Sequence, residues 1–424
     1  MSIKILLLQG PVGPFFRNLS DEFKEIGHIV YKVNFNAGDR YFYPGSRTLD
    51  YKGTPESWAQ NLRGLIRKLS IDRIYVFGDC RFYHAVARDI AREEGVRYFV
   101  FEEGYLRPDY ITLEEDGVNG HTNMSFPDDN SFFKLKSMRQ SHHNFKNHFF
   151  TVAWYAIQYY LAACIQKKHF PEYHHHRPLN VPGEGSKWIL SGWRKLVRYW
   201  SSRKVEKLAA NKLSGKYYMV PLQVHVDMQV LQHSSFRSVE EFITLTLESF
   251  SLHAPDDLHI IIKHHPMDRG YRDYTALIRN LAEKLGLQDR VIYVFDSHLP
   301  TLLKHALGTV TINSTVGLSS LHHGVPVKPM GSAIYDIEGL SFQGSIDEFW
   351  RYTGGVDQNL YKAFRQHLLD TNQVNGNFYQ KPRTSKTPTG LAWTPFLGQQ
   401  HFSHTRRPDK HTATRPVLIK NSAA

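Results

Sequence analysis

Short apolar runs alternate with helical segments along most of this chain, and this alternation limits the possible folds more than any other feature. Strands that are separated by helices pair in parallel, because each crossover needs a dozen or more residues. The predicted strands are 3–9, 28–35, 72–79 and 96–104, and then 217–224, 258–266, 290–296, 308–313 and 325–330. The sequence therefore predicts an α/β protein with two Rossmann-like domains.

A chain of 424 residues is too long for one compact core, which supports two domains with additional segments. We expect an N-terminal Rossmann-like domain, a helical and basic-aromatic connecting region, a C-terminal Rossmann-like domain, a C-terminal helix, and a basic, disordered tail. The corresponding ranges are 1–130, 131–213, 214–350, 351–379 and 380–424.

The net charge of +12 is concentrated in two segments. Residues 187–212 and 380–424 each hold eight Lys or Arg against one acidic residue, a net charge of +7 each, so the rest of the chain carries −2. This pattern argues against nucleic-acid binding by a whole domain and for local contact with an anionic surface. Tryptophans interleave with the cations of 187–212, which fits a helix at a membrane surface; the alternative is a solvated helix whose tryptophans pack on a domain.

The uncharged stretch Phe149–Ile165 has 17 residues. A membrane span needs about 20 apolar residues, and this stretch includes three tyrosines. We therefore interpret it as a buried or interfacial helix.

Several functional classes lack their sequence signatures. Two cysteines, Cys80 and Cys164, exclude a disulfide framework and a four-thiolate metal site. No GxGxxG, P-loop or HExxH motif is present, and His174-His175-His176 lies in a Pro-rich stretch without carboxylate partners, so we interpret it as a surface loop. We expect no metal and no cofactor. The N-terminal residues form a strand pattern and not a secretory signal, which favours a reducing cytoplasm.

Polar side chains follow three of the predicted strands, at the edge where open α/β sheets bind ligands. Glu102 and Glu103 come first, and Gly104 allows a sharp turn after them. Adjacent carboxylates raise each other's pKa, which suits a general base or a nucleophile. An ion pair with Arg107 is the structural alternative.

The other two features lie in the second domain. Lys263, His264 and His265 precede Pro266, and a histidine near a lysine can bind a phosphate and assist a departing nucleotide. Ser314 and Thr315 lie where a strand meets a helix, beside Gly317, and their hydroxyls could bind the same phosphate. Ordinary strand-end histidines and a plain helix cap are the structural alternatives. Together with the acidic pair, these residues predict a cleft between the two domains, with the acceptor site and the catalytic acid on the first domain and a nucleotide sugar on the second. This is the arrangement called GT-B in glycosyltransferases, and the lack of a DxD-like metal site agrees with metal-independent transfer.

The sequence also resembles a known family, on the stretches LQGPVGPFF, VFGDCRFYH, FEEGYLRPDYIT, PLQVHVDMQV, KHHP, INSTVGLSSLHHGVPV and GLSFQGSIDEFW. They resemble the capsule polysaccharide biosynthesis and export proteins of Gram-negative bacteria, in particular the shorter KpsS/LipB type of Kdo transferase. The resemblance implies transfer of 3-deoxy-D-manno-octulosonic acid (Kdo) from CMP-Kdo to a (lyso)phosphatidylglycerol-type lipid. This step begins a β-linked Kdo linker, which a longer Kdo transferase extends before export.

The resemblance also implies roles for single residues. Glu103 becomes the leading catalytic acid with Glu102 as its neighbour, and His265 assists the departure of CMP. Related enzymes often have Asp at the Glu-Glu-Gly position. Transfer with retention leaves two roles open for Glu103, nucleophile or base. The donor-binding residues are Lys263, His264, Pro266, Ser314, Thr315 and Gly317, and the cleft residues are Gln223, Asp227, Asp79, Arg81, His84 and Arg107.

The implied partners are a nucleotide sugar, an anionic lipid acceptor, the longer transferase and the export complex, with no nucleic acid. The protein would lie in the cytoplasm, peripherally on the inner face of the inner membrane, with residues 187–212 as the docking surface. Three other interpretations remain: a transferase of another CMP-activated acidic sugar such as sialic acid, a non-catalytic polysaccharide-binding or export component, and an RNA-binding protein.

Overall fold

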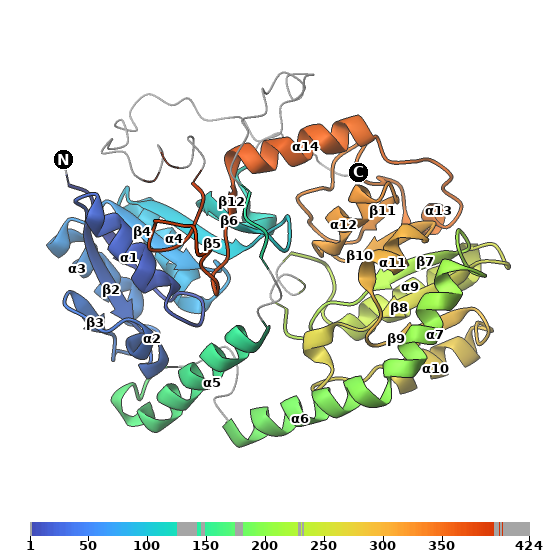
Figure 1. The fold of residues 1–424 in the computed structure, drawn as a ribbon, viewed down its shortest axis with the longest axis horizontal. Coiled ribbons are helices and arrows are strands. Elements are labelled where there is room, and N and C mark those ends of the chain that lie inside the picture. The colour runs from blue at the N-terminus through green and yellow to red at the C-terminus, as the bar shows by residue number, and fades with distance from the viewer. Residues whose placement is uncertain are drawn as a thin grey trace.

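The computed structural model describes residues 2–124, 142–145, 149–173, 181–227, 230, 233–393, 398 and 401, without the side chains of 181, 182 and 184. The chain forms two α/β lobes that lie side by side, each built on its own sheet (Figure 1). The prediction of two Rossmann-like domains is confirmed, and each predicted strand contains an observed one.

The N-terminal lobe holds a seven-stranded sheet in the order β12-β6-β5-β4-β1-β2-β3. Its strands β1 to β5 are parallel, and β6 is antiparallel to both of its neighbours, β5 and β12. The strands are β1 (Lys4–Leu7), β2 (Ile29–Asn34), β3 (Thr48–Asp50), β4 (Arg73–Phe77), β5 (Arg97–Glu103), β6 (Tyr110–Glu115) and β12 (Gln373–Asn375). The helices are α1 (Phe15–Glu25), α2 (Ala37–Phe42), α3 (Trp58–Leu69) and α4 (Phe82–Glu93). Buried apolar side chains form a separate core on each face of this sheet.

The C-terminal lobe holds a five-stranded parallel sheet in the order β11-β10-β7-β8-β9. The strands are β7 (Tyr217–Pro221), β8 (His259–Lys263), β9 (Val291–Val294), β10 (Gly308–Thr311) and β11 (Val327–Pro329). The helices are α9 (Val239–His253), α10 (Thr275–Lys284), α11 (Leu299–Lys304), α12 (Val316–His322), α13 (Ile346–Phe349) and α14 (Gln358–Thr371). After α14 the chain returns to the N-terminal lobe, where β12 pairs with β6.

The expectation of an unstructured tail from residue 380 is wrong for 380–393, because this segment packs on the N-terminal lobe. Leu391 is only 3% exposed in the core of that lobe. The Trp393 ring N–H and the Thr389 backbone N–H donate to the two carboxylate oxygens of Glu22, at 2.7 and 3.0 Å. The basic composition of the tail concealed these few apolar anchors. Residues 402–424 lie outside the described part of the chain.

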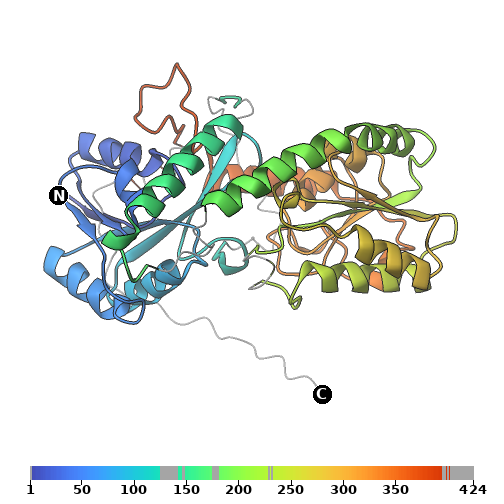
Figure 2. The same ribbon diagram turned by 90° about the horizontal axis from the view of Figure 1, so that it is seen from below.

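Three helices lie between the lobes in sequence: α5 (Phe149–Ile165), α6 (Val181–Val197) and α7 (Tyr199–Ala210). Helix α5 packs against α2 of the N-terminal lobe, whereas α6 and α7 run along the C-terminal lobe (Figures 1 and 2). Only Tyr159 and Ala163 of α5 are buried, so this helix lies at a surface. In the residues that the structure describes, no helix combines the length and the apolar character needed to cross a bilayer.

Candidate active site

The loop after β4 places a buried carboxylate at the edge of the N-terminal sheet. Gly78 has a φ of +72°, which the absence of a side chain allows, and the chain then turns so that Asp79 is 1% exposed. Asp79 accepts hydrogen bonds from the Val118 backbone N–H (3.2 Å) and from Nδ1 of His121 (2.9 Å). These contacts fix Asp79 as a structural anchor of the loop.

His84 lies beneath the same loop and does not line the site, so its assignment to the cleft is wrong. Its side chain is fully buried, and its Nδ1–H donates to the Gly78 carbonyl at 2.6 Å. Burial lowers the pKa of His84 to about 3, so the ring stays neutral. The neighbouring Arg81 donates to Oε1 of Gln9 at 2.9 Å. His84 therefore positions the loop from within the core.

The acidic pair lies at the end of β5. Because side chains alternate along a strand, Glu102 and Glu103 point to opposite faces of the sheet. Burial raises the pKa of Glu102 to about 7, and the negative charges of Glu103 and Asp79 contribute to this rise. On the other face, Oε1 of Glu103 accepts a long hydrogen bond (3.5 Å) from the hydroxyl of Tyr379, in the segment that returns after β12.

The turn after this pair requires glycine. A Cβ on Gly104 would lie 2.0 Å from the carbonyl oxygen of Tyr110. The sharp turn that the sequence predicted at Gly104 is therefore present, and it brings the chain directly back as β6.

The loop after β8 places His264 and His265 in different surroundings, although the sequence predicted one site for both. His264 is 1% exposed, stacks near Phe295 and contacts the Tyr293 hydroxyl through Nδ1 at 2.7 Å. Its side chain belongs to the core, which corrects its assignment to donor binding. His265 is only partly buried, and its Nδ1 accepts from the Met267 backbone N–H at 3.2 Å. In neutral His265 the proton is therefore on Nε2.

Electrostatic interactions link His265 to the other lobe. Burial lowers the pKa of His265 to about 3, and the positive charges of Lys263 and Arg107 contribute. Arg107 belongs to the N-terminal lobe, where its charge also opposes the upward shift in the pKa of Glu102. Lys263 is itself buried, which lowers its pKa to about 8. Pro266 is exposed at the start of the exit turn.

The third group of predicted site residues, Ser314 and Thr315 beside Gly317, follows β10. The Ser314 Oγ accepts from the Val316 backbone N–H at 3.2 Å, while the Thr315 side chain makes no capping hydrogen bond. A Cβ on Gly317 would lie 2.3 Å from the ring of Tyr335. Gly317 is therefore required for packing against Tyr335, and the structure gives it no place in a donor site.

Gln223 and Asp227 adjoin the same loop. The Gln223 amide donates to Oδ2 of Asp227 (3.3 Å) and to Oδ1 of Asn313 (3.0 Å). Asn313 in turn donates to the backbone carbonyl of His233 at 3.4 Å. This network links the predicted residues of the C-terminal lobe to its boundary with the other lobe.

Sequence reasoning missed His121 and His233, which meet Cys80 at this boundary. The rings of the two histidines lie 4.4 Å apart, and Nε2 of His233 lies 3.7 Å from Sγ of Cys80. No local motif identifies these residues, because they come from three distant parts of the chain. The fold alone brings them together.

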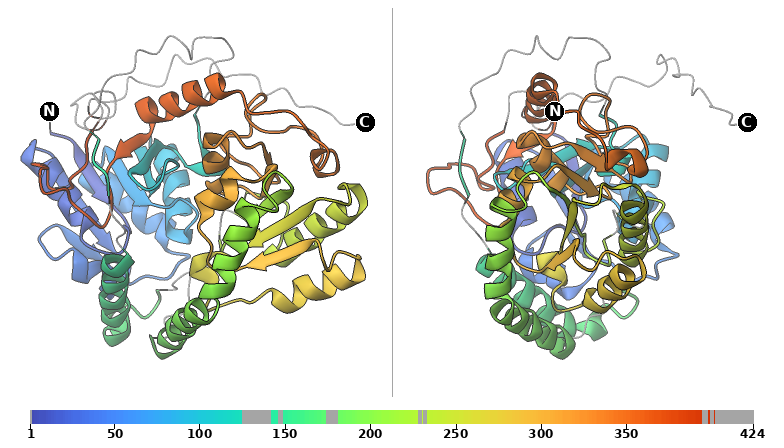
Figure 3. Two further views of the ribbon diagram at one scale, coloured as in Figure 1. Left: turned by 45° about the vertical axis from the view of Figure 1, so that its right-hand side comes forward. Right: turned by 90° about the vertical axis from the view of Figure 1, so that its right-hand side faces the viewer.

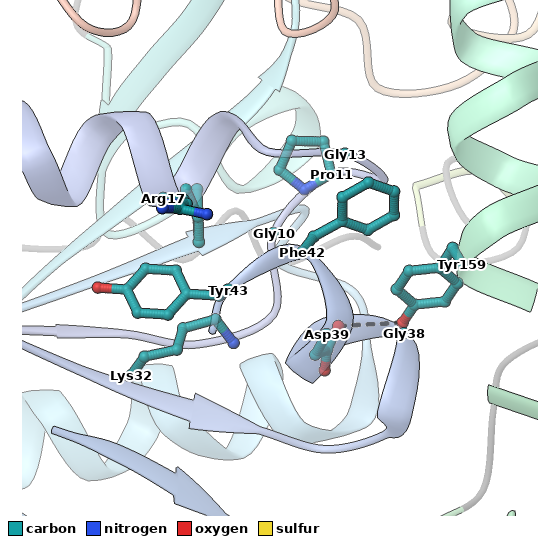
Figure 4. Close-up of a pocket in the computed structure, with 11 residues that line it drawn as sticks. Gly10, Pro11, Gly13, Arg17, Lys32, Gly38, Asp39, Phe42, Tyr43 and Tyr159 are labelled. Atoms are coloured by element: carbon teal, nitrogen blue, oxygen red, sulfur yellow. Dashed lines mark hydrogen bonds between the residues drawn. The ribbon is translucent and has the colours of Figure 1, made fainter. Parts of the chain in front are cut away.

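A small cavity lies elsewhere, between α1, α2 and α5 (Figure 4). Its volume of about 20 Å³ has room for little more than one water molecule. Tyr159 of α5 donates to Asp39 at its rim, at 3.0 Å (Figure 4). The cavity marks where α5 joins the lobe and is too small for a nucleotide sugar.

A family model and two curated relatives agree on one family. A family described as "Capsule polysaccharide biosynthesis protein" matches residues 72–379. The chain is 42% identical to the capsule polysaccharide export protein KpsS of Escherichia coli, over 89% of this chain and 97% of that protein. It is 41% identical to the capsule polysaccharide modification protein LipB of Neisseria meningitidis serogroup B, over 93% and 96%. Among solved structures, KpsC of Thermosulfurimonas dismutans, a β-Kdo 2,7 transferase, matches with a TM-score of 0.41 at 14% identity, over 87% and 92%.

Proposed function

The chain belongs to the capsule polysaccharide biosynthesis protein family, and from this premise we propose that it is a glycosyltransferase that moves Kdo from CMP-Kdo to a (lyso)phosphatidylglycerol acceptor. The observation that carries the proposal is the place of two polar loops: the acidic residues end β5 of one sheet, and His265 follows β8 of the other. Arg107 lies beside the acidic residues, where its Nε donates to the Gly104 carbonyl at 3.2 Å. Its positive charge also contributes to the lowered pKa of His265, which supports an approach of the two loops where the lobes meet.

The departing CMP requires hydrogen-bond donors and positive charge around its phosphate. His265 offers its Nε2–H, since its Nδ1 is occupied by the Met267 backbone N–H. Lys263 and Arg107 add positive charge close to the same ring. The hydroxyls of Ser314 and Thr315 complete the proposed phosphate site.

The acidic pair serves the sugar and the acceptor. With a pKa of about 7, Glu102 exchanges a proton near neutral pH, which suits a general base. We assign the reacting carboxylate to Glu103, as nucleophile or base toward an oxocarbenium-like centre. A retaining course would make Glu103 the nucleophile, and the anomeric configuration of the product distinguishes the two roles.

The test is incubation of the purified chain with CMP-Kdo and a lyso-phosphatidylglycerol analogue, followed by mass measurement of the lipid and quantification of CMP. We expect the mass of one Kdo to be added. Glu103→Gln and His265→Ala should each lower kcat by about 10²- to 10⁴-fold. Glu93→Gln, on the exposed surface of α4, is the matched control and should act like the wild type.

Two other results would contradict the proposal. Turnover of CMP-sialic acid in place of CMP-Kdo would assign another sugar. Capsule production that is unchanged by Glu103→Gln and His265→Ala would make the protein a non-catalytic component.

A lipid acceptor also accounts for the exposed faces of two helices. In α5, Phe150, Trp154 and Ile165 are 86%, 58% and 72% exposed at helical spacing. A second stripe on α6 and the start of α7 consists of Ile189, Trp193, Leu196 and Trp200, all at least 60% exposed. Both stripes belong to helices on one side of the molecule, away from α14 (Figures 1 and 3). We call these residues the helical face.

Cations close to the helical face favour an anionic bilayer as the surface that this face binds. Lys195, Arg203 and Lys204 are exposed. Arg203 pairs with Glu206 of its own helix at 3.2 Å, but its side chain is still 55% exposed. Arg194 and Arg198 bind Asp273 of the C-terminal lobe, each at 3.5 Å, so they stabilise the helix and are not free for lipid. The structure therefore leaves Lys195, Arg203 and Lys204 as docking cations, a smaller set than the whole of residues 187–212 that the sequence predicted.

Vesicle sedimentation tests the helical face. The variant Lys195→Gln/Arg203→Gln/Lys204→Gln should bind phosphatidylglycerol vesicles more weakly, by about 1 kcal/mol or roughly fivefold for each charge removed. The matched control is Lys68→Gln/Arg92→Gln/Lys362→Gln, three exposed cations on other elements. Equal binding by the two triple variants would contradict this docking surface.

A further inference from the structure

Cys80, His121 and His233 bring three potential metal ligands together where the two lobes meet. One ligand atom from each residue lies within 4.8 Å of the others, and the pair Cys80 Sγ and His233 Nε2 is 3.7 Å apart. In tetrahedral zinc sites the bond lengths place sulfur and nitrogen ligands about 3.6 Å apart, and two nitrogens about 3.3 Å apart. One pair is therefore already at ligand spacing, and the third ligand needs to move by at most about 1.5 Å.

The surroundings of His121 match those of a metal-binding histidine. Its Nδ1 contacts Oδ2 of Asp79 at 2.9 Å, and Asp79 is itself buried and held by the Val118 backbone N–H. Histidines that bind metals usually donate their second ring N–H to such a carboxylate, which fixes the ring and the tautomer. This contact leaves Nε2 of His121 as the ligand atom.

His233 is held in place from the C-terminal lobe. Its carbonyl oxygen accepts from the Ser332 backbone N–H at 2.8 Å, and Ser234 forms a β-bridge with Gly331. Its ring approaches the other lobe at Gly120, where a Cβ would lie 2.4 Å from Nδ1 of His233. Only glycine at this position allows the imidazole to reach Cys80 and His121.

We propose that Cys80, His121 and His233 bind a zinc-class transition metal ion that links the two lobes. A thiolate with two imidazoles selects Zn²⁺ or Co²⁺ and not the Mg²⁺ that oxygen ligands prefer. Three protein ligands leave the fourth tetrahedral position to water. Binding releases the thiol proton of Cys80. The proposal is independent of the transferase activity, and it revises the expectation of no metal, which rested on the absence of local motifs.

Cobalt titration of the metal-free full chain tests the site, because a thiolate ligand gives Co²⁺ a sulfur-to-metal charge-transfer band in the near ultraviolet. We expect this band in the wild type, its loss in Cys80→Ser and its retention in Cys164→Ser, the matched control at the other cysteine of the chain. Asp79→Asn should weaken binding by about 10- to 100-fold through the ring of His121. A wild type without the band, or a Cys80→Ser variant that keeps it, would overturn the proposal.

Two further controls keep the result specific. Replacing His174, His175 and His176 with Ala removes a histidine run that could bind cobalt without sulfur, and the band should persist. Zn²⁺ should raise the unfolding temperature of the wild type by mass action, and His233→Ala should remove that rise because the ligand from the C-terminal lobe is gone. A rise of the same size in His233→Ala would show that the ion does not link the lobes. Far-ultraviolet circular dichroism verifies that each variant is folded.

Discussion

Glu102 makes the free energy of unfolding depend on pH, and the size of this dependence can be calculated and measured. Its folded-state pKa of about 7 lies above its ordinary value of 4.5, because burial disfavours the charged form. Below pH 4.5 the carboxyl is protonated in both states and has no effect. As the pH rises from 4.5 to 7 the unfolded state loses the proton first, so the free energy of unfolding falls. One pKa unit corresponds to 1.36 kcal/mol, so the loss between about pH 5 and pH 8 is roughly 2 to 3 kcal/mol.

Glu102→Gln removes this penalty and keeps the shape of the side chain. We expect the free energy of unfolding of the variant, relative to the wild type, to increase by roughly 2 to 3 kcal/mol between pH 5 and pH 8. Urea unfolding followed by circular dichroism, in the presence of a chelator, measures the difference at each pH. Because Glu114 also has a pKa raised to about 7 by burial, the wild type retains other pH dependence, and only the difference between the two proteins isolates Glu102. A difference that stays constant with pH would refute the reasoning.

Two further predictions concern packing. Leu391→Ala should lower the free energy of unfolding by about 2 to 4 kcal/mol in urea, because the side chain is buried in the N-terminal core; a cost below about 0.5 kcal/mol would mean that the returning segment is not part of that core. Gly38→Ala should loosen α5, because its Cβ would lie 2.6 Å from the ring of Tyr159, and limited proteolysis should cut the variant faster in the 142–173 region than the wild type. Gly64→Ala, where a Cβ meets nothing within 4 Å, is its control, and equal cleavage of all three proteins would contradict the packing of α5.

The sequence was sufficient for the parallel strands, because each one is a buried apolar run such as Ile260–Ile262 followed by a turn signal. It was not sufficient for β6 or β12. Strand β12 has three residues, Gln373–Asn375, and is positioned by pairing with a strand that is distant in the sequence. Local periodicity carries no information about such a partner.

For the candidate active site, too, the sequence carried no information about contacts between distant parts of the chain. The positions of residues in single loops could be predicted: the acidic pair ends a strand and His265 follows one, as the structure shows. Strand alternation then placed His264 in the core, and tertiary packing buried His84, which the sequence pattern alone does not distinguish from an exposed histidine. The cluster of Cys80, His121 and His233 depends on the contact between the lobes, so no spacing in the sequence indicates it.

The late return of the chain has a consequence for synthesis on the ribosome. Strand β12 emerges only after the whole C-terminal lobe has been translated, so until then β6 is paired with β5 alone and its outer edge has no partner. The C-terminal lobe is contiguous and can fold as soon as it emerges, whereas the first lobe to be made is the last to be finished. Nascent chains that stall before residue 373 should therefore present an open strand to chaperones, and release of the full-length chain should end that exposure.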